Sequence, residues 1–176
     1  MKRITHICLF AALAFAFCGK TADETSGAEV MRDPAITEVD VGAVVKAVAN
    51  HKGKVVLVNM WATWCEPCVE EFPDLVSLHR KYRDRGLEVI GVSHDFHEMV
   101  ESDLIPFIKE QGADFTHFLQ NGQTAQDFID GIDPIWSGVL PATLVYDREG
   151  IRVKYIPGRF DTGELEDLVL TLLEQQ

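Results

Sequence analysis

The sequence has few cysteines and no apolar segment long enough to cross a membrane as a helix. Only four of its 176 residues are cysteine, too few to build a fold on disulfides, so each cysteine needs its own explanation. The longest apolar run, residues 7–17, falls well short of the roughly 20 residues that span a bilayer. No internal repeat or low-complexity tract follows residue 35. These absences argue against a disulfide scaffold, a repeat array and a stable membrane-spanning helix.

Basic residues are also scarce. Lysine and arginine number 16 against 28 aspartates and glutamates, which gives a formal net charge of −12 at neutral pH. So acidic a surface argues against nucleic acid and against anionic membrane surfaces as electrostatic partners. The apolar share of 47% and the charged share of 25% are ordinary for a globular protein. The length fits one domain with modest additions.

The N-terminus has the pattern of a targeting signal. Lys2 and Arg3 give it a positive start, residues 7–17 are almost entirely apolar, and several small alanines lie within that run. This order of features is typical of a secretory signal peptide. We therefore expect residues 1–17 to be removed and the mature protein to be exported to the periplasm or cell envelope.

Cys18 directly follows the apolar run, as the cysteine of a bacterial lipoprotein processing site does. Phe15 and Phe17 depart from that pattern, and the alternative is an ordinary cleavage that leaves Cys18 as a free thiol. Because an unpaired thiol is awkward in an exported protein, we favour Cys18 as a lipidated first mature residue. Residues 18–35 are small, polar and acidic and predict a flexible linker. The folded domain is then expected over residues 36–176.

Helical and strand patterns alternate through the domain. They predict helices at 40–49, 66–85, 97–111, 123–130 and from Asp161 onward, and strands at 55–60, 87–92, 115–119, 142–146 and 151–156. Pro106 must kink or split the third helix. The first two strands and the helix between them form a βαβ unit with parallel strands, whereas the last two strands form a hairpin. We expect a three-layer α/β fold with a central mixed sheet flanked by helices.

The segment Trp64-Cys65-Glu66-Pro67-Cys68 carries the chemistry. Cys65 directly follows a predicted buried strand, and Cys68 falls in the first turn of the next helix. The unpaired amides and the dipole at a helix N-terminus stabilise a thiolate, which is the nucleophile in thiol exchange. Pro67 costs little there, because amides of the first turn lack helical partners. The spacing also lets the two sulfurs meet and close a disulfide.

Two other uses of a Cys-x-x-Cys pattern fit this sequence less well. A structural zinc site needs a second pair of ligands, and none remains once Cys8 and Cys18 are assigned to the signal region. A structural disulfide that closes so short a loop contributes little stability. The pattern and its strand–helix context therefore favour redox chemistry.

Several segments resemble the TlpA/ResA family, the thioredoxin-like thiol-disulfide oxidoreductases of bacterial cell envelopes. The similar segments are residues 55–68, Glu71-Phe72-Pro73 and Leu140-Pro141-Ala142-Thr143. The resemblance covers about residues 40–175. It implies a thioredoxin-like fold and an enzyme of the protein-disulfide reductase type, whose cysteines work without a cofactor and without a metal.

The resemblance also implies roles for residues around the cysteines. In this family a cis-proline at the start of the hairpin strand faces the cysteine pair, and Pro141 matches that position. The backbone beside it, at Leu140, pairs with the substrate, while Trp64, Glu66 and Pro67 complete the binding motif. The alternative is that Pro141 begins a strand with a trans peptide bond. With the Cys-x-x-Cys upstream, the resemblance favours cis.

The proton acceptor of thioredoxin is absent from this chain. Thioredoxin has an aspartate six residues before its first active-site cysteine, and Asn59 stands there instead. Glu71 lies three residues after Cys68 on the same helical face, and in ResA-like proteins a glutamate at this position is near both cysteines. A half-buried carboxyl group there has a raised pKa and can take the proton of Cys68. The alternative is a solvated side chain like that of Glu70.

The sequence therefore predicts an exported reductant of protein disulfides. Its partners would be disulfide-containing exported proteins, with apocytochromes c among them, and a membrane thiol carrier that supplies electrons; we expect a monomer. The same pair would act as an oxidant if its reduced form were sufficiently stabilised. A copper chaperone is the binding alternative, since paired thiolates suit Cu(I). The Pro-x-x-x-Thr/Ser-x-x-Cys pattern of a peroxiredoxin is absent around Cys65.

Two further segments are less specific. His94 and His97 have a His-x-x-His spacing, but without a third ligand we expect exposed histidines in a polar loop rather than a metal site. Residues 123–138, which include Trp136, form a segment longer than the family resemblance implies. We expect that segment to shape access to the cysteines.

Overall fold

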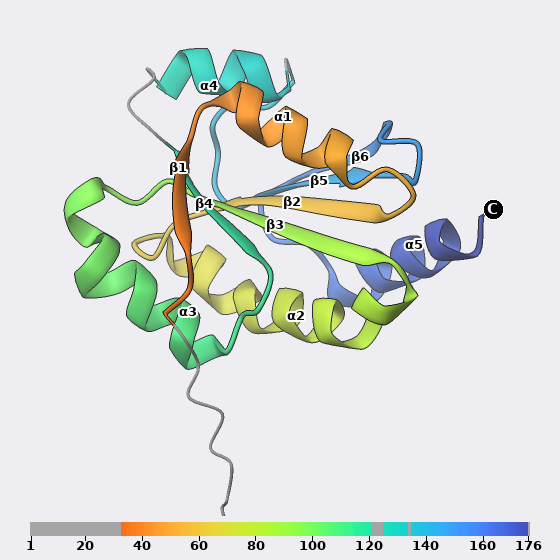
Figure 1. Ribbon diagram of the computed structural model, residues 1–176, viewed down its shortest axis with the longest axis horizontal. Helices are drawn as coiled ribbons and strands as arrows, with labels where there is room; N and C mark the ends of the chain where they lie inside the picture. The colour runs from red at the N-terminus through yellow and green to blue at the C-terminus, as the bar shows by residue number, and fades with distance from the viewer. Residues whose placement is uncertain (1–32, 121–124, 134, 176) are drawn as a thin grey trace, which may run out of the picture. The chain divides into compact units, whose positions relative to one another are not determined.

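A six-stranded mixed sheet forms the centre of the fold (Figure 1), with the strand order β1-β4-β3-β2-β5-β6. The first four strands in this order are parallel, and β5 runs antiparallel to both of its neighbours. The predicted βαβ unit and the predicted hairpin are therefore confirmed. The strands are Ile36–Val39 (β1), Val55–Trp61 (β2), Leu87–Ser93 (β3), Thr116–Gln120 (β4), Ala142–Tyr146 (β5) and Arg152–Pro157 (β6).

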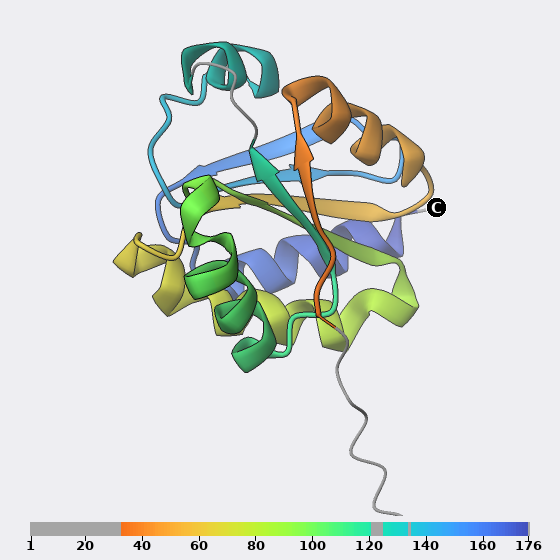
Figure 2. The ribbon, with the colours of Figure 1, turned by 60° about the vertical axis from the view of Figure 1, so that its left-hand side comes forward.

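In the part of the chain that the structure describes, five α-helices cover the two faces of the sheet. Figures 1 and 2 show α1 and α4 on one face and α2, α3 and α5 on the other. Each face carries its own core of buried apolar side chains, so the predicted three-layer α/β fold is confirmed. The helices are Val41–Asn50 (α1), Glu66–Tyr82 (α2), Ile105–Gln111 (α3), Ala125–Ile132 (α4) and Thr162–Glu174 (α5).

The computed structural model describes residues 33–120, 125–133 and 135–175. The predicted signal peptide, Cys18 and nearly all of the predicted linker lie outside these residues. Where the chain is described, no helix is both long enough and apolar enough to cross a membrane.

Strand β2 lies inside the sheet and leads into the cysteine segment. All seven of its residues are buried, because β3 and β5 flank it and helices cover both faces. A continuous apolar run is typical of a strand in this position. Its last residue, Trp61, packs against Phe72 of α2 with ring centroids 4.4 Å apart. The end of β2 and the body of α2 are thereby fixed against each other.

One predicted helix is divided, and one strand was not predicted. The predicted 97–111 helix is divided, as Pro106 implied: a 3-10 turn at His97–Met99 and a π-helical turn at Val100–Leu104 precede α3. Pro106 lies in the first turn of α3, where its missing amide hydrogen costs little. Strand β1 was not predicted. Its sequence lacks the apolar pattern of a strand, and only Val39 among its four residues is buried. The strand is defined by its parallel pairing with β4.

Candidate active site

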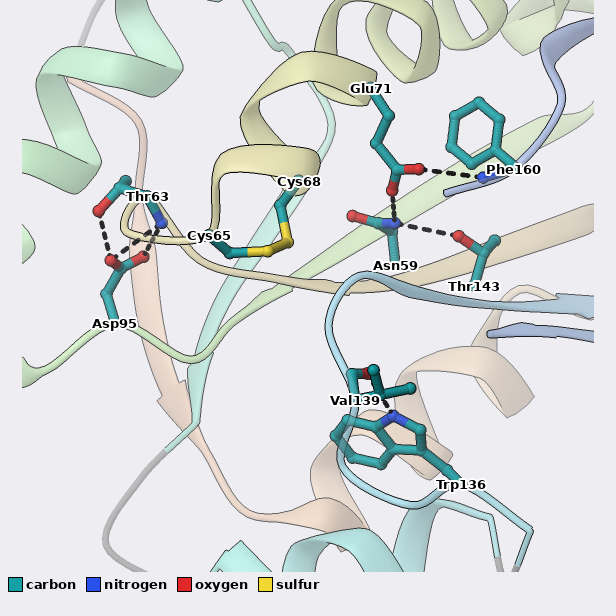
Figure 3. The surroundings of a disulfide bond; sticks show 10 residues. All are labelled: Asn59, Thr63, Cys65, Cys68, Glu71, Asp95, Trp136, Val139, Thr143 and Phe160. Atoms are coloured by element: carbon teal, nitrogen blue, oxygen red, sulfur yellow. Dashed lines mark hydrogen bonds between the residues drawn. A yellow bond between two sulfur atoms is a disulfide. The ribbon is translucent and has the colours of Figure 1, made fainter. Parts of the chain in front are cut away.

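The two cysteines of the motif are joined in a disulfide at the start of α2 (Figure 3), with their Cα atoms 5.2 Å apart. Cys65 is the N-cap residue of α2 and is 7% exposed, whereas Cys68 in the first turn is fully buried. The side chain of Cys65 makes no capping hydrogen bond. Its sulfur therefore lies at the positive end of the helix dipole, where a thiolate is stabilised.

Glu71 lies one helical turn beyond Cys68 and is only 2% exposed. The Asn59 side-chain amide donates to Glu71 Oε1 at 3.0 Å, and the Phe160 backbone amide donates to Glu71 Oε2 at 3.2 Å. Asn59 Nδ2 also donates to the hydroxyl oxygen of Thr143 at 3.0 Å. Figure 3 shows this chain of contacts beside the disulfide. The residue in place of the thioredoxin aspartate is thus a hydrogen-bond donor to a carboxyl group on the neighbouring helix.

The protonation of Glu71 is set mainly by its burial. Burial raises the pKa of Glu71 from 4.5 to about 7, while the hydrogen bonds from Asn59 and Phe160 act to lower it. A carboxyl group with this pKa gains and loses a proton near neutral pH, as general acid–base chemistry requires. Glu70 is exposed, and its carboxylate pairs with Arg159 at 2.6 Å. The raised pKa predicted for Glu71 is confirmed, and its part in catalysis stays a prediction.

The Leu140–Pro141 peptide bond is cis, as predicted. Pro141 immediately precedes β5, whose first residue, Ala142, pairs with Met60 of β2. Met60 lies five residues before Cys65, so the cis bond and the cysteine pair lie at the same end of the sheet. Pro141 itself is buried and Leu140 is half-buried.

The remaining residues of the motif lie on the surface. Trp64 is 52% exposed, which is unusual for so large an apolar side chain. Glu66 is the first residue of α2, Pro67 follows it in the first turn, and both are exposed. All three side chains are therefore accessible to a partner that approaches Cys65.

The sequence analysis missed the role of Asp95. This residue lies two positions after the end of β3 and is 5% exposed. Its carboxylate accepts hydrogen bonds from the Thr63 amide at 3.1 Å, from the Thr63 hydroxyl, and from the Ser93 hydroxyl at 2.6 Å. Thr63 lies two residues before Cys65, so Asp95 holds the loop that carries this cysteine. The sequence did contain a signal, because Asp95 comes just after a predicted buried strand that runs parallel to β2. The carboxyl ends of parallel strands meet at one edge of the sheet, so its side chain could be expected near the loop that follows β2.

His94 is mostly buried, and the expectation of an exposed histidine there was wrong. Its ring packs edge-on against Phe128 of α4 and against Trp136, and burial lowers its pKa to about 4. Trp136 is itself buried and donates its indole N–H to the Val139 carbonyl at 2.9 Å. The described part of the 123–138 segment thus covers the end of β3 and leads into the loop before Pro141.

His97 is exposed, as expected, and pairs with Glu38 of β1 rather than with the cysteines. Its Nδ1 lies 2.7 Å from Glu38 Oε1. Within the described ranges, no three metal-ligating side chains gather in one place. The described geometry therefore brings no third ligand to the cysteine pair.

These features define a class of protein. A disulfide between two cysteines three residues apart, at the N-terminus of a helix that follows an inner parallel strand, with a cis-proline at the same sheet end, is the arrangement of a thioredoxin-fold redox domain. The chain belongs to the AhpC/TSA family, whose model matches residues 34–156.

Named relatives agree with this assignment. The thiol-disulfide oxidoreductase ResA of Bacillus anthracis is 31% identical over 115 residues, which are 65% of this chain and 61% of that protein. ResA of Oceanobacillus iheyensis is 31% identical over 140 residues, covering 79% of this chain and 67% of the relative. The match to the Bacillus relative thus spans about three-fifths of its length. A crystal structure of a thioredoxin-family thiol:disulfide interchange protein from Chlorobium tepidum TLS has a TM-score of 0.61 at 27% identity, covering 71% of this chain and 83% of that one.

Proposed function

We propose that this protein is an exported thiol-disulfide oxidoreductase that reduces disulfide bonds in other exported proteins. One observation carries the proposal: the Cys65–Cys68 disulfide opens α2, with the buried carboxyl group of Glu71 one turn behind it and the cis bond before Pro141 at the same sheet end. The relatives named thiol-disulfide oxidoreductase support the same reaction class.

The first step uses Cys65, because it is the more accessible of the two cysteines. In the reduced protein its thiolate attacks one sulfur of a substrate disulfide. A mixed disulfide forms between Cys65 and the substrate, and the second substrate sulfur leaves as a thiolate. Trp64, Glu66 and Pro67 contact the substrate around this bond, and the backbone at Leu140 aligns it.

The second step uses Cys68, which is fully buried. Glu71 takes the proton of the Cys68 thiol, and the resulting thiolate attacks the sulfur of Cys65. The Cys65–Cys68 bond closes, and the substrate leaves with both of its sulfurs reduced. Two electrons have passed from the pair to the substrate, and Glu71 returns its proton to solvent or to the departing thiolate.

The oxidised pair then needs two electrons from a donor dithiol, and we propose a membrane thiol carrier for this step. In the same proposal residues 1–17 are removed on export, Cys18 carries a lipid, and residues 18–35 form the tether. Apocytochromes c, whose haem-binding cysteines must be reduced, are one substrate class that fits. Mass spectrometry of the mature N-terminus tests the lipid directly.

Capture of substrates on a Cys68→Ser variant tests the function. Without the second thiol the mixed disulfide on Cys65 cannot resolve, so bound proteins stay covalently attached and are identified after release with a reductant. We expect exported proteins that carry cysteine pairs. The matched control is Cys65→Ser, which leaves only the buried cysteine and should capture few or none.

Two outcomes would contradict the proposal. If Cys68→Ser captures nothing while the reduced wild-type protein binds Cu(I) tightly, the protein is a copper carrier. If only the oxidised wild-type protein reacts with captured partners, and introduces disulfides into them, it is an oxidant.

A further inference from the structure

The loop between β2 and Cys65 is held by the carboxylate of Asp95. The Thr63 amide donates to both carboxylate oxygens, at 3.1 and 3.2 Å, and the Thr63 hydroxyl donates to one of them. The Ser93 hydroxyl donates to the other oxygen at 2.6 Å, and its own oxygen accepts from the Asp95 amide at 3.0 Å. In each of these contacts the carboxylate accepts the hydrogen bond. The network therefore fixes the position of the Asp95 carboxylate beside the loop that carries Cys65.

This buried negative charge has no cationic partner in the part of the chain that the structure describes, since none of the ion pairs there includes Asp95. The adjacent His94 is neutral at pH 7, because burial lowers its pKa to about 4. Figure 3 shows Asp95 and Thr63 on the Cys65 side of the disulfide. Because Asp95 is buried and bonded to Thr63, two residues before Cys65, its charge acts on the surroundings of Cys65 with little screening by solvent.

Three other charged residues near the cysteine pair do not offset the negative charge of Asp95. Glu66 is an exposed acid in the first turn of α2, and Glu71 is a buried acid behind Cys68. Arg159, from the loop between β6 and α5, pairs with Glu70. The N-terminus of α2 is thus the feature that favours a thiolate on Cys65, and Asp95 opposes it.

We propose that Asp95 is a positioning residue for the cysteine pair whose charge also makes the pair a stronger reductant. The inference rests on the proposed function. When the disulfide is reduced, two electrons come from a donor dithiol, which becomes a disulfide; Cys68 takes up a proton and Cys65 is left as a thiolate or takes up a second one. A nearby carboxylate destabilises that thiolate and so the reduced form. A pair with a destabilised reduced form gives its electrons to substrates more readily.

The test is an Asp95→Asn variant of the full chain. Asparagine keeps an oxygen that accepts from Thr63, so the loop stays in place while the charge is removed. We expect the midpoint of the pH profile for alkylation of Cys65 by iodoacetamide to fall by about half to one pH unit. In a glutathione redox buffer at a pH above that midpoint, the equilibrium should shift about three- to tenfold toward the dithiol form.

Two variants separate charge from loop geometry. Thr63→Val removes a hydroxyl bond to the carboxylate but keeps its charge, and it should leave the alkylation midpoint within about 0.2 pH unit of wild type. Glu98→Gln removes an exposed acid three residues from Asp95 and should likewise have little effect, because solvent screens it. Circular dichroism of each variant verifies that it is folded.

An unchanged or raised midpoint in Asp95→Asn would overturn the inference. So would an equal fall in Thr63→Val, because loop geometry would then account for the effect. These measurements involve only the protein, iodoacetamide and glutathione, and no protein substrate. If substrate capture fails but the midpoint moves as expected, the proposed function is wrong while the effect of Asp95 on the pair holds.

Discussion

Glu71 is the residue on which the proposed second step depends. Its pKa is raised to about 7 by burial, so it is protonated below that pH and can accept the Cys68 proton only above it. We expect the rate of mixed-disulfide resolution, measured by stopped flow with a small disulfide, to rise with pH through about 7 in the wild type. In Glu71→Gln this rise should disappear, and the rate near pH 8 should fall by about a hundredfold, which is typical for loss of a general base.

Asn59 supplies the discriminating control for this prediction. Its amide lowers the pKa of Glu71 by donating to it, so Asn59→Leu should move the inflection upward by about one pH unit. Thr143→Val removes only the other partner of Asn59 and should leave the inflection nearly in place. A resolution rate with the same pH profile in Glu71→Gln and in the wild type would rule out proton transfer through Glu71.

At the scale of elements, α5 depends on its N-cap. Asp161 accepts a hydrogen bond from the Glu164 amide at 2.9 Å, and the helix begins at the next residue. This cap also ends the loop through which the Phe160 amide reaches Glu71. We expect Asp161→Ala to lower the free energy of unfolding by about 1 kcal/mol, as loss of an aspartate cap does. Urea unfolding followed by circular dichroism measures this change.

The matched variant for the cap is Asp161→Asn, since asparagine caps helices about as well as aspartate. It should retain the stability that alanine loses. If both variants are as stable as the wild type, the cap contributes nothing, and packing of Leu165 and Val169 into the core holds the helix by itself.

At the scale of the whole molecule, buried titratable groups make stability depend on pH. Burial lowers the pKa of His94 and of His117 from 6.5 to about 4 each. Between these values the unfolded chain binds more protons than the folded protein, so stability present above pH 6.5 is lost as the pH falls. Glu71 acts oppositely: its raised pKa contributes stability below pH 4.5 that is lost as the pH rises to about 7.

The contributions of His94 and His117 together exceed the opposite contribution of Glu71, so the protein loses stability as the pH falls below 6.5. We expect the free energy of unfolding, from urea titrations, to fall by roughly 2 to 3 kcal/mol between pH 6.5 and 4.5. His117→Gln should flatten this slope, whatever its effect at neutral pH, whereas His97→Gln, at an exposed position, should not. A slope that is the same in all three proteins would show that His117 does not carry the effect.

Much of the fold could be predicted because its signals are local. The buried run of β2, the cap before α5 and the turn between β5 and β6 each depend on neighbouring residues, and the strands and helices follow them closely. Strand β1 could not be predicted, because only Val39 is buried in it and its partner β4 lies about eighty residues away. His94 was misjudged for a similar reason, since the rings that bury it come from α4 and from Trp136.

The same distinction between local and tertiary information applies to the site around the cysteine pair. The sequence by itself identified the candidate reactive residues: Cys65 and Cys68 fall on one helical turn after a buried strand, and that placement follows from spacing alone. Only the tertiary structure decided what surrounds them. Asn59 and Phe160 meet Glu71 from two other elements, and Asp95 reaches Thr63 from the end of β3. These partners are brought together by the pairing of strands and the packing of helices, and their charges and hydrogen bonds act through space, not along the chain.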